Sequence, residues 1–138
     1  MLRQARRRNQ KAITAGQLRL VEADVVNLPA DLGGPFDRIF SSNVFGFLGN
    51  PENAFRRLRS QLSPNGIIAT TWLPRLGSKS DDVAAGMADR IAQVCSNAGL
   101  AVQRTEFRRF DGVLAFCVIA GTAHNEPSRS AVDNCSPK

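Results

Sequence analysis

The sequence predicts an α/β fold with a mostly parallel sheet that ends in an antiparallel hairpin. Helical and strand-like patterns alternate over residues 1–98, as they do in parallel sheets whose strands are joined by helices. Near the end of the chain, two apolar runs flank Asp111 and Gly112, a dipeptide that favours the tight turn of a hairpin. The parallel pattern is therefore expected to close with an antiparallel pair.

The first third of the chain is expected to hold a helix, two strands and a long loop. Residues 1–15 place apolar side chains on a rough helical stripe that stops at Gly16. Residues 18–23 form a short strand-like run, and residues 36–42 form a second one. The loop between them, residues 24–35, is rich in glycine and proline, which favour turns.

The rest of the chain continues the alternation. Asparagine followed by proline is a favoured helix start, since asparagine caps the helix and proline fits its first position. The further predicted elements are a helix from Asn50-Pro51 to a turn at Pro64-Asn65-Gly66, a buried parallel strand over 66–72, a helix over 81–98 with Val83 inward and Gly99 as its stop, and hairpin strands over 101–109 and 113–120.

The predicted strands also suggest where the core and the binding loops lie. Ile39-Phe40 and Ile67-Ile68 are adjacent apolar pairs, which predict strands covered on both faces. Ligands of open α/β sheets collect beyond the carboxyl ends of the strands. The loops after the first three predicted strands are therefore the candidate binding loops.

Composition limits the class of protein. The 138 residues suit one domain, which we place at residues 1–121, followed by a polar tail over 122–138 that we expect to be disordered. No apolar run approaches the roughly 20 residues that span a bilayer. Three scattered cysteines and no secretory signal favour reduced thiols in the cytoplasm. With a single histidine in the chain, no His/Cys metal cluster is expected.

The net charge of +6 comes largely from the first eleven residues, where arginine and lysine occur without an acid. A solvated helix face is the favoured interpretation. A nucleic-acid surface and a mitochondrial transit peptide are the alternatives. Nucleic-acid binding is disfavoured because base stacking needs an aromatic platform and the chain has no tyrosine.

Several segments taken together resemble class I S-adenosylmethionine-dependent methyltransferases, and in particular the branch that modifies small molecules. They include "LRLVEADVVNLP", "PFDRIFSSNVFGFL", "NPENAFRRLRSQLSPNGIIATTW" and the hairpin, in that order. The resemblance covers residues 1 to about 121. It implies a Rossmann-like fold, S-adenosyl-L-methionine as cofactor and methyl transfer to a small-molecule acceptor, with the catalytic residues unassigned.

The resemblance also implies residues that contact the cofactor. Asp24 matches the acid that accepts a hydrogen bond from the adenine amino group, and Val25 matches its neighbour against the adenine ring. Ser42 and Asn43 match the strand end beside the methionine moiety. The residue types alone allow local roles too: Asp24 as a loop cap, and Ser42 and Asn43 as partners of nearby backbone groups.

The sequence departs from the family at its start. It has no strand followed by a glycine-rich turn and no second strand ending in the acid that binds the ribose. The resemblance therefore implies a domain that is N-terminally truncated and lacks the first two strands of the family fold. We expect the chain to bind the cofactor weakly or not at all, and to have exposed strand edges that favour self-association. A catalytically inactive remnant or an interaction module is the alternative function.

Overall fold

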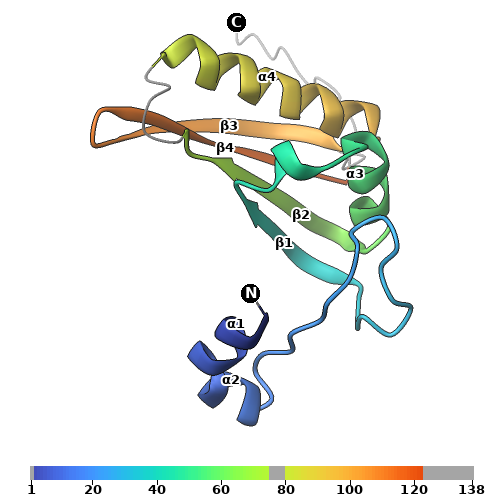
Figure 1. Ribbon diagram of the computed structural model, residues 1–138. Coiled ribbons are helices and arrows are strands. Elements are labelled where there is room, and N and C mark those ends of the chain that lie inside the picture. The colour runs from blue at the N-terminus through green and yellow to red at the C-terminus, as the bar shows by residue number, and fades with distance from the viewer. Residues whose placement is uncertain (1, 75–79, 123–138) are drawn as a thin grey trace, which may run out of the picture.

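The structure is a computed structural model that describes residues 2–74 and 80–122. Its helices are α1 (Leu2–Arg8), α2 (Gln10–Thr14), the short 3-10 helix η1 (Phe45–Phe47), α3 (Pro51–Arg59) and α4 (Asp81–Asn97). Its strands are β1 (Phe36–Ser42), β2 (Leu62–Trp72), β3 (Ala101–Phe110) and β4 (Val113–Gly121) (Figure 1). Apart from Thr122, the tail predicted to be disordered lies outside the described residues.

The strands form one sheet in the order β1-β2-β4-β3. β1 pairs with β2 in parallel, whereas β4 runs antiparallel to both β2 and β3. The predicted α/β sheet with a terminal hairpin is therefore present, but only one of the three pairings is parallel. Among the described residues β1 has a single neighbour, so its other edge is unpaired there, as the sequence led us to expect.

The strand predicted over residues 18–23 is wrong, because this segment runs as irregular chain between α2 and the loop before β1. A strand is stable only when a neighbour pairs with its N–H and C=O groups. None of the four described strands pairs with this segment. The apolar residues of the segment are typical of a strand, but the segment lies where no described strand can pair with it.

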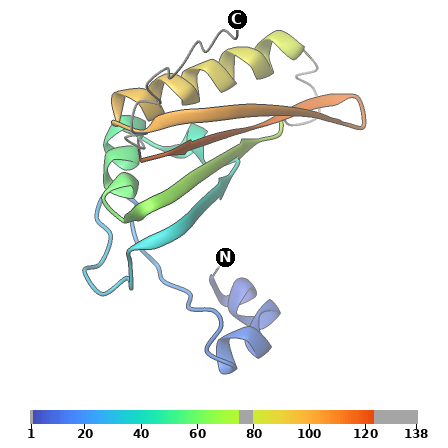
Figure 2. The same cartoon turned by 180° about the vertical axis from the view of Figure 1, so that it is seen from behind.

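Helices α3 and α4 both lie on one face of the sheet, and α1 and α2 lie apart from it (Figures 1 and 2). No residue of α1 or α2 is buried. The predicted helix over residues 1–15 is present as two short helices, and Gly16 follows with a positive φ of 71°.

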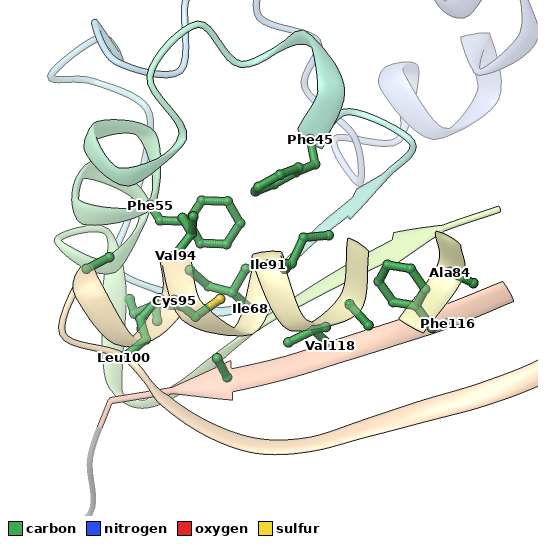
Figure 3. Close-up of a cluster of buried hydrophobic side chains, with 14 residues drawn as sticks. Phe45, Phe55, Ile68, Ala84, Ile91, Val94, Cys95, Leu100, Phe116 and Val118 are labelled. Carbon is green, nitrogen blue, oxygen red and sulfur yellow. The ribbon is translucent and has the colours of Figure 1, made fainter. Parts of the chain in front are cut away.

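The core lies between α4 and the sheet. Figure 3 shows Ile91 and Cys95 of α4 packed over Ile68 of β2 and Val118 of β4. Ala84 and Ala88 let the helix approach closely, and both are fully or almost fully buried. Val83, predicted to point inward, is instead 45% exposed, because the inward stripe of α4 begins one residue later.

Burial alternates along β2, so the prediction of strands covered on both faces is wrong. Ile68 and Thr70 are each 1% exposed, whereas Ile67 and Ala69 are only half-buried. On β1, Phe40 is 70% exposed. The cause is that the described helices that pack on the sheet cover one face only, and a side chain changes face at every residue of a strand.

Two further boundaries follow from local chemistry. Helix α3 begins at Pro51, with Asn50 as its cap as predicted, but it ends at Arg59. β2 therefore starts at Leu62 rather than Gly66. At the hairpin, Asp111 and Gly112 both have positive φ values, 46° and 79°, as a two-residue turn of type I′ requires.

The hairpin is also tied to the start of α4. The Arg109 guanidinium donates hydrogen bonds to both carboxylate oxygens of Asp81, at 2.6 and 3.2 Å. This hydrogen bond holds the pKa of Asp81 below its ordinary value. The pair is exposed, so its contribution to stability is small.

Candidate functional site

Two cavities lie near residues that follow β1 and β2. The first cavity, of about 250 Å³, is formed by the loop before β1 and by the segment from η1 to the start of α3. Its lining residues are Asp24, Val25, Val26, Phe47, Leu48, Gly49, Asn50, Asn53 and Ala54. The structure thus places two of the four residues suggested by the resemblance, Asp24 and Val25, on one cavity wall.

The wall that carries Asp24 is held by local and longer-range contacts. The Oδ1 atom of Asp24 accepts a hydrogen bond from the backbone N–H of Val26 at 3.1 Å. Further along the loop, the Arg57 guanidinium on α3 donates to the backbone oxygen of Leu28 at 3.3 Å. Asp24 therefore does act as a loop cap, through one carboxylate oxygen. Its other oxygen, Oδ2, has no hydrogen-bond partner within the described residues.

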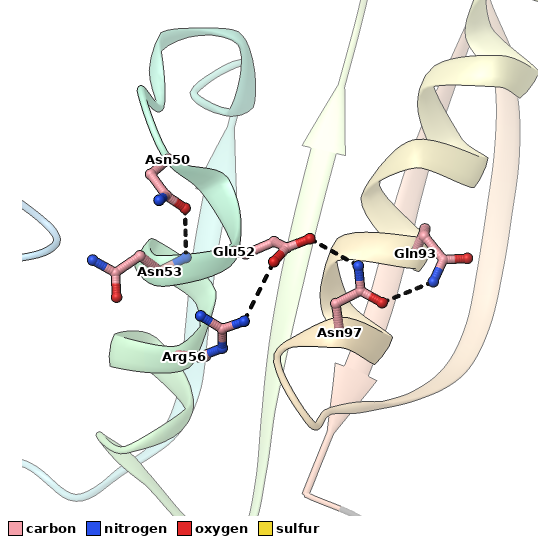
Figure 4. A network of polar contacts seen from close by, with 6 residues as sticks. All are labelled: Asn50, Glu52, Asn53, Arg56, Gln93 and Asn97. Atoms are coloured by element: carbon pink, nitrogen blue, oxygen red, sulfur yellow. Dashed lines mark hydrogen bonds and ion pairs between the residues drawn. The ribbon is translucent and has the colours of Figure 1, made fainter.

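The opposite wall depends on the first turn of α3. The side-chain oxygen of Asn50 accepts a hydrogen bond from the backbone N–H of Asn53 at 3.0 Å, which caps the helix (Figure 4). Glu52 then bridges two helices: it accepts from Arg56 at 3.3 Å and from Asn97 of α4 at 2.8 Å (Figure 4). The start of α3 is thereby fixed at the edge of the cavity.

The short helix η1 is anchored by its first residue. Phe45 is 5% exposed and packs edge-on against Phe55, with ring centroids 6.2 Å apart. The Arg90 guanidinium of α4 lies 5.9 Å from the centroid of the Phe45 ring. Because Phe45 points into the core, Phe47 is left 80% exposed beside the cavity. The sequence analysis missed Phe47, since nothing in its spacing separates it from a core aromatic.

Ser42 and Asn43 do not line either cavity. Ser42 is exposed at the end of β1. Asn43 has a positive φ of 53°; its N–H donates to the Thr71 carbonyl at 3.0 Å, and its side-chain oxygen accepts from the N–H of Leu73 at 2.8 Å. Asn43 therefore joins the ends of β1 and β2, the local backbone role that its residue type allowed.

The second cavity, of about 360 Å³, lies between the end of β2 and the hairpin. Its lining residues are Thr71, Trp72, Leu73, Glu106, Arg108, Phe110, Ala115, Phe116 and Cys117. None of them was a candidate from the sequence, because their convergence depends on the pairing of β2 with β4 and of β4 with β3. Burial, and secondarily the Glu106 carboxylate, raise the pKa of the Cys117 thiol.

Neither a metal-binding cluster nor a membrane-spanning helix is found among the described residues. The described side chains include no group of three or more His, Cys, Asp or Glu that could hold a metal ion. Within residues 2–74 and 80–122, no helix has the length and apolar character needed to cross a membrane. The two cavities are the candidate sites that the described residues offer.

A family model described as a methyltransferase domain matches residues 1–70. The chain therefore belongs to the methyltransferase domain family. No protein of curated function matches the chain by sequence.

Solved structures of methyltransferases share the fold. An O-methyltransferase from neocarzinostatin biosynthesis, solved with S-adenosyl-L-homocysteine and 1,4-dihydroxy-2-naphthoic acid, is 15% identical with a TM-score of 0.62, over 86% of this chain and 38% of that one. A TehB-like methyltransferase from Corynebacterium glutamicum is 17% identical with a TM-score of 0.57, over 81% and 60%. The [4+2]-cyclase SpnF is 13% identical with a TM-score of 0.61, over 84% and 60%.

The chain thus spans 38% to 60% of the length of these three proteins. At these identities the likeness concerns the fold, and it confirms the Rossmann-like α/β class.

Proposed function

We propose that the protein is an S-adenosyl-L-methionine-dependent methyltransferase acting on a small-molecule acceptor, and that the first cavity holds the adenine end of the cofactor. The observation that carries the proposal is the convergence of Asp24 and Val25 with the η1 segment on one cavity, in a chain whose residues 1–70 match a methyltransferase domain. The homocysteine form of the cofactor in one structure of the same fold adds support.

The chemistry of the first cavity suits an adenine ring. A planar heteroaromatic ring needs apolar walls and a few polar groups that fix its orientation. Val25, Val26 and Leu48 are half-buried and supply the walls. The Oδ2 atom of Asp24 is the acceptor available for an exocyclic amino group, since Oδ1 already serves Val26.

S-adenosyl-L-methionine, when bound, supplies an electrophilic methyl group on a sulfonium. The residues of this chain contribute positioning, which is the main requirement of an in-line displacement. Ser42, exposed at the end of β1, and Asn43, which joins the ends of β1 and β2, are proposed to border the methionine moiety. No side chain is assigned as a general base.

Binding of S-adenosyl-L-homocysteine tests the proposal. The sequence has no strand followed by a glycine-rich turn, so we expect affinity weaker than micromolar, measured by ligand-observed NMR. Asp24→Ala removes one hydrogen bond, which is worth about 0.5–1.5 kcal/mol, and should weaken binding roughly threefold to tenfold. Asp31→Ala removes an acid from the same loop that lies outside the cavity and should leave binding unchanged. Equal effects of the two substitutions, or no binding, would contradict the proposal.

A binding or other catalytic role without methyl transfer is the second candidate. It is favoured by the SpnF cyclase, which has the same fold and is named for a different reaction. The experiment first establishes that the protein binds S-adenosyl-L-homocysteine. Transfer of a labelled methyl group from the cofactor to any acceptor would then exclude this second candidate.

We also propose a cellular compartment and a mode of self-association for the protein. We place the protein in the cytoplasm, supported by the free thiols of Cys95 and Cys117. Self-association is proposed through the free edge of β1, because an unpaired edge is a template for another strand. A nucleic-acid acceptor is not favoured.

A further inference from the structure

The second cavity is built on the sheet face that α4 does not cover. Val118 and Phe116 of β4 belong to the core under α4, so Cys117 between them, and Ala115, point to the opposite face. Thr71 pairs with Cys117, and Ala115 pairs with Arg108. These residues form the floor of the cavity.

One side of the cavity is a row of three alternate residues on β3. Glu106, Arg108 and Phe110 lie two residues apart and line the same cavity, as successive positions on one face of a strand do. Leu73 and Trp72, at the end of β2, form the other side. Phe110 is 51% and Leu73 is 43% exposed, so two large apolar side chains face solvent across a hollow rather than being covered.

The charge of the cavity is set by Arg108. The Glu106 carboxylate accepts a hydrogen bond from Arg104 at 2.5 Å, so its charge has a partner within its own strand. Arg108 has no ion-pair partner among the described residues. Cys117 is a neutral thiol, because burial raises its pKa. One free positive charge thus lies among aromatic and apolar side chains.

Size and lining together define a ligand class. A volume of about 360 Å³ lies near the lower end of the roughly 300–1,000 Å³ that is usual for small-molecule pockets. It suits one or two fused rings. Phe110 offers a ring face and edge for stacking, and a guanidinium binds a carboxylate through two parallel hydrogen bonds. Trp72 borders the cavity at the end of β2, with its ring against Phe116 at a centroid distance of 5.8 Å.

We propose that this second cavity is a binding site for a small aromatic carboxylate, with Phe110 against the ring and Arg108 on the carboxylate. The inference rests on the proposed function, in which it is the site of the methyl acceptor and gives the acceptor its chemical class. The hydrogen bond between Asn43 and Leu73 places this cavity directly beside the end of β1, where the methionine moiety is proposed to lie.

The test uses the 138-residue chain without cofactor. Trp72 is the single tryptophan of the sequence and borders the cavity, so its fluorescence serves as the reporter of binding there. Benzoate should change that fluorescence saturably, and it should bind roughly tenfold more tightly than benzamide, which has the same ring without the charge. Equal affinities would overturn the role of Arg108. No saturable change with either compound would overturn the site.

Variants separate the cavity from general charge effects. Arg108→Gln should remove the preference for benzoate, whereas Arg38→Gln, which removes an equal charge from β1 outside the cavity, should keep it. Ala115→Phe fills the floor at a half-buried position and should abolish binding of both compounds. Circular dichroism confirms that each variant is folded. If Arg38→Gln weakened benzoate binding as much as Arg108→Gln, the inference would be wrong.

The two proposals fail in distinguishable ways. Benzoate binding that persists while S-adenosyl-L-homocysteine does not bind would count against the proposed function alone. If S-adenosyl-L-homocysteine binds in a way that depends on Asp24, but benzoate leaves the Trp72 fluorescence unchanged, the result would count against the acceptor site alone.

Discussion

Cys95 lies on the inner face of α4, and its side chain is almost fully enclosed by the core, with 1% exposed. Burial raises the pKa of its thiol to about 12 from an ordinary value of 9.0. Since the thiolate is the reactive form, the residue is protected twice, by access and by protonation. Cys117 is only half-buried, so its thiol is more accessible to reagents than that of Cys95.

We therefore predict that a thiol reagent modifies Cys117 well before Cys95 at mildly alkaline pH. The experiment uses a Cys135→Ser background, so that two thiols remain, and locates the label by peptide mass spectrometry. Unfolding in denaturant should make the two rates equal. Equal rates in the native protein would contradict the buried placement of Cys95.

The same thiol makes stability depend on alkaline pH. In the unfolded chain the thiol ionises near its ordinary value of 9.0, whereas in the folded chain it stays protonated to about 12. Stability is thus fully present below pH 9 and falls between these values, by up to about 1.4 kcal/mol per pH unit. Because the sequence has no tyrosine, this fall should be visible in denaturant midpoints. Cys95→Ala should reduce its slope.

At the scale of elements, two glycines are expected to respond oppositely to alanine. Gly112 has a φ of 79° in the hairpin turn, which an alanine side chain disfavours, so Gly112→Ala should destabilise the protein by about 1 kcal/mol. Gly86 lies in α4 with open space around its Cα, so Gly86→Ala should stabilise it by roughly 0.5–1 kcal/mol. Thermal unfolding measures both. Changes of the same sign would show that the turn or the helix is misplaced.

Elements with local signals were predictable from the sequence. β1 occupies residues 36–42 as expected, and Asn50-Pro51 and Asp111-Gly112 mark the helix start and the hairpin, because caps and turns are properties of a few adjacent residues. The 18–23 segment was not predictable in the same way, since a strand also depends on a distant partner. That partner is not specified by the segment's own residues.

The residues of the candidate site likewise differ in how far the sequence could predict them. Asp24 and Val25 were suggested by resemblance, and the structure places them on a cavity. Phe47 and the residues around Arg108 were missed, because their neighbours come from other elements. Strand alternation alone put Glu106, Arg108 and Phe110 on one face; only the pairing of β2 with β4 turned that row into a cavity wall.

At the scale of the whole molecule, the sheet face opposite α4 governs behaviour in solution. Phe40, 70% exposed on β1, lies on that face beside a free strand edge. Exposed apolar surface next to an unpaired edge favours association. We predict that Phe40→Lys lowers the oligomer fraction measured by light scattering. Phe47→Lys removes an equally exposed phenylalanine away from the sheet and should have little effect. If both substitutions lowered the oligomer fraction equally, association would depend on exposed apolar surface in general and not on this face of the sheet.

The hydrogen bond from the Leu73 N–H to the Asn43 side chain forms a direct structural connection between the segments that lead to the two cavities. Leu73 lines the second cavity, and the chain from Asn43 leads within four residues to Phe47 in the first. Cooperativity between two ligands is reciprocal by thermodynamic necessity. If the proposed ligands of the two cavities are coupled through this hydrogen bond, each must change the affinity for the other by the same factor.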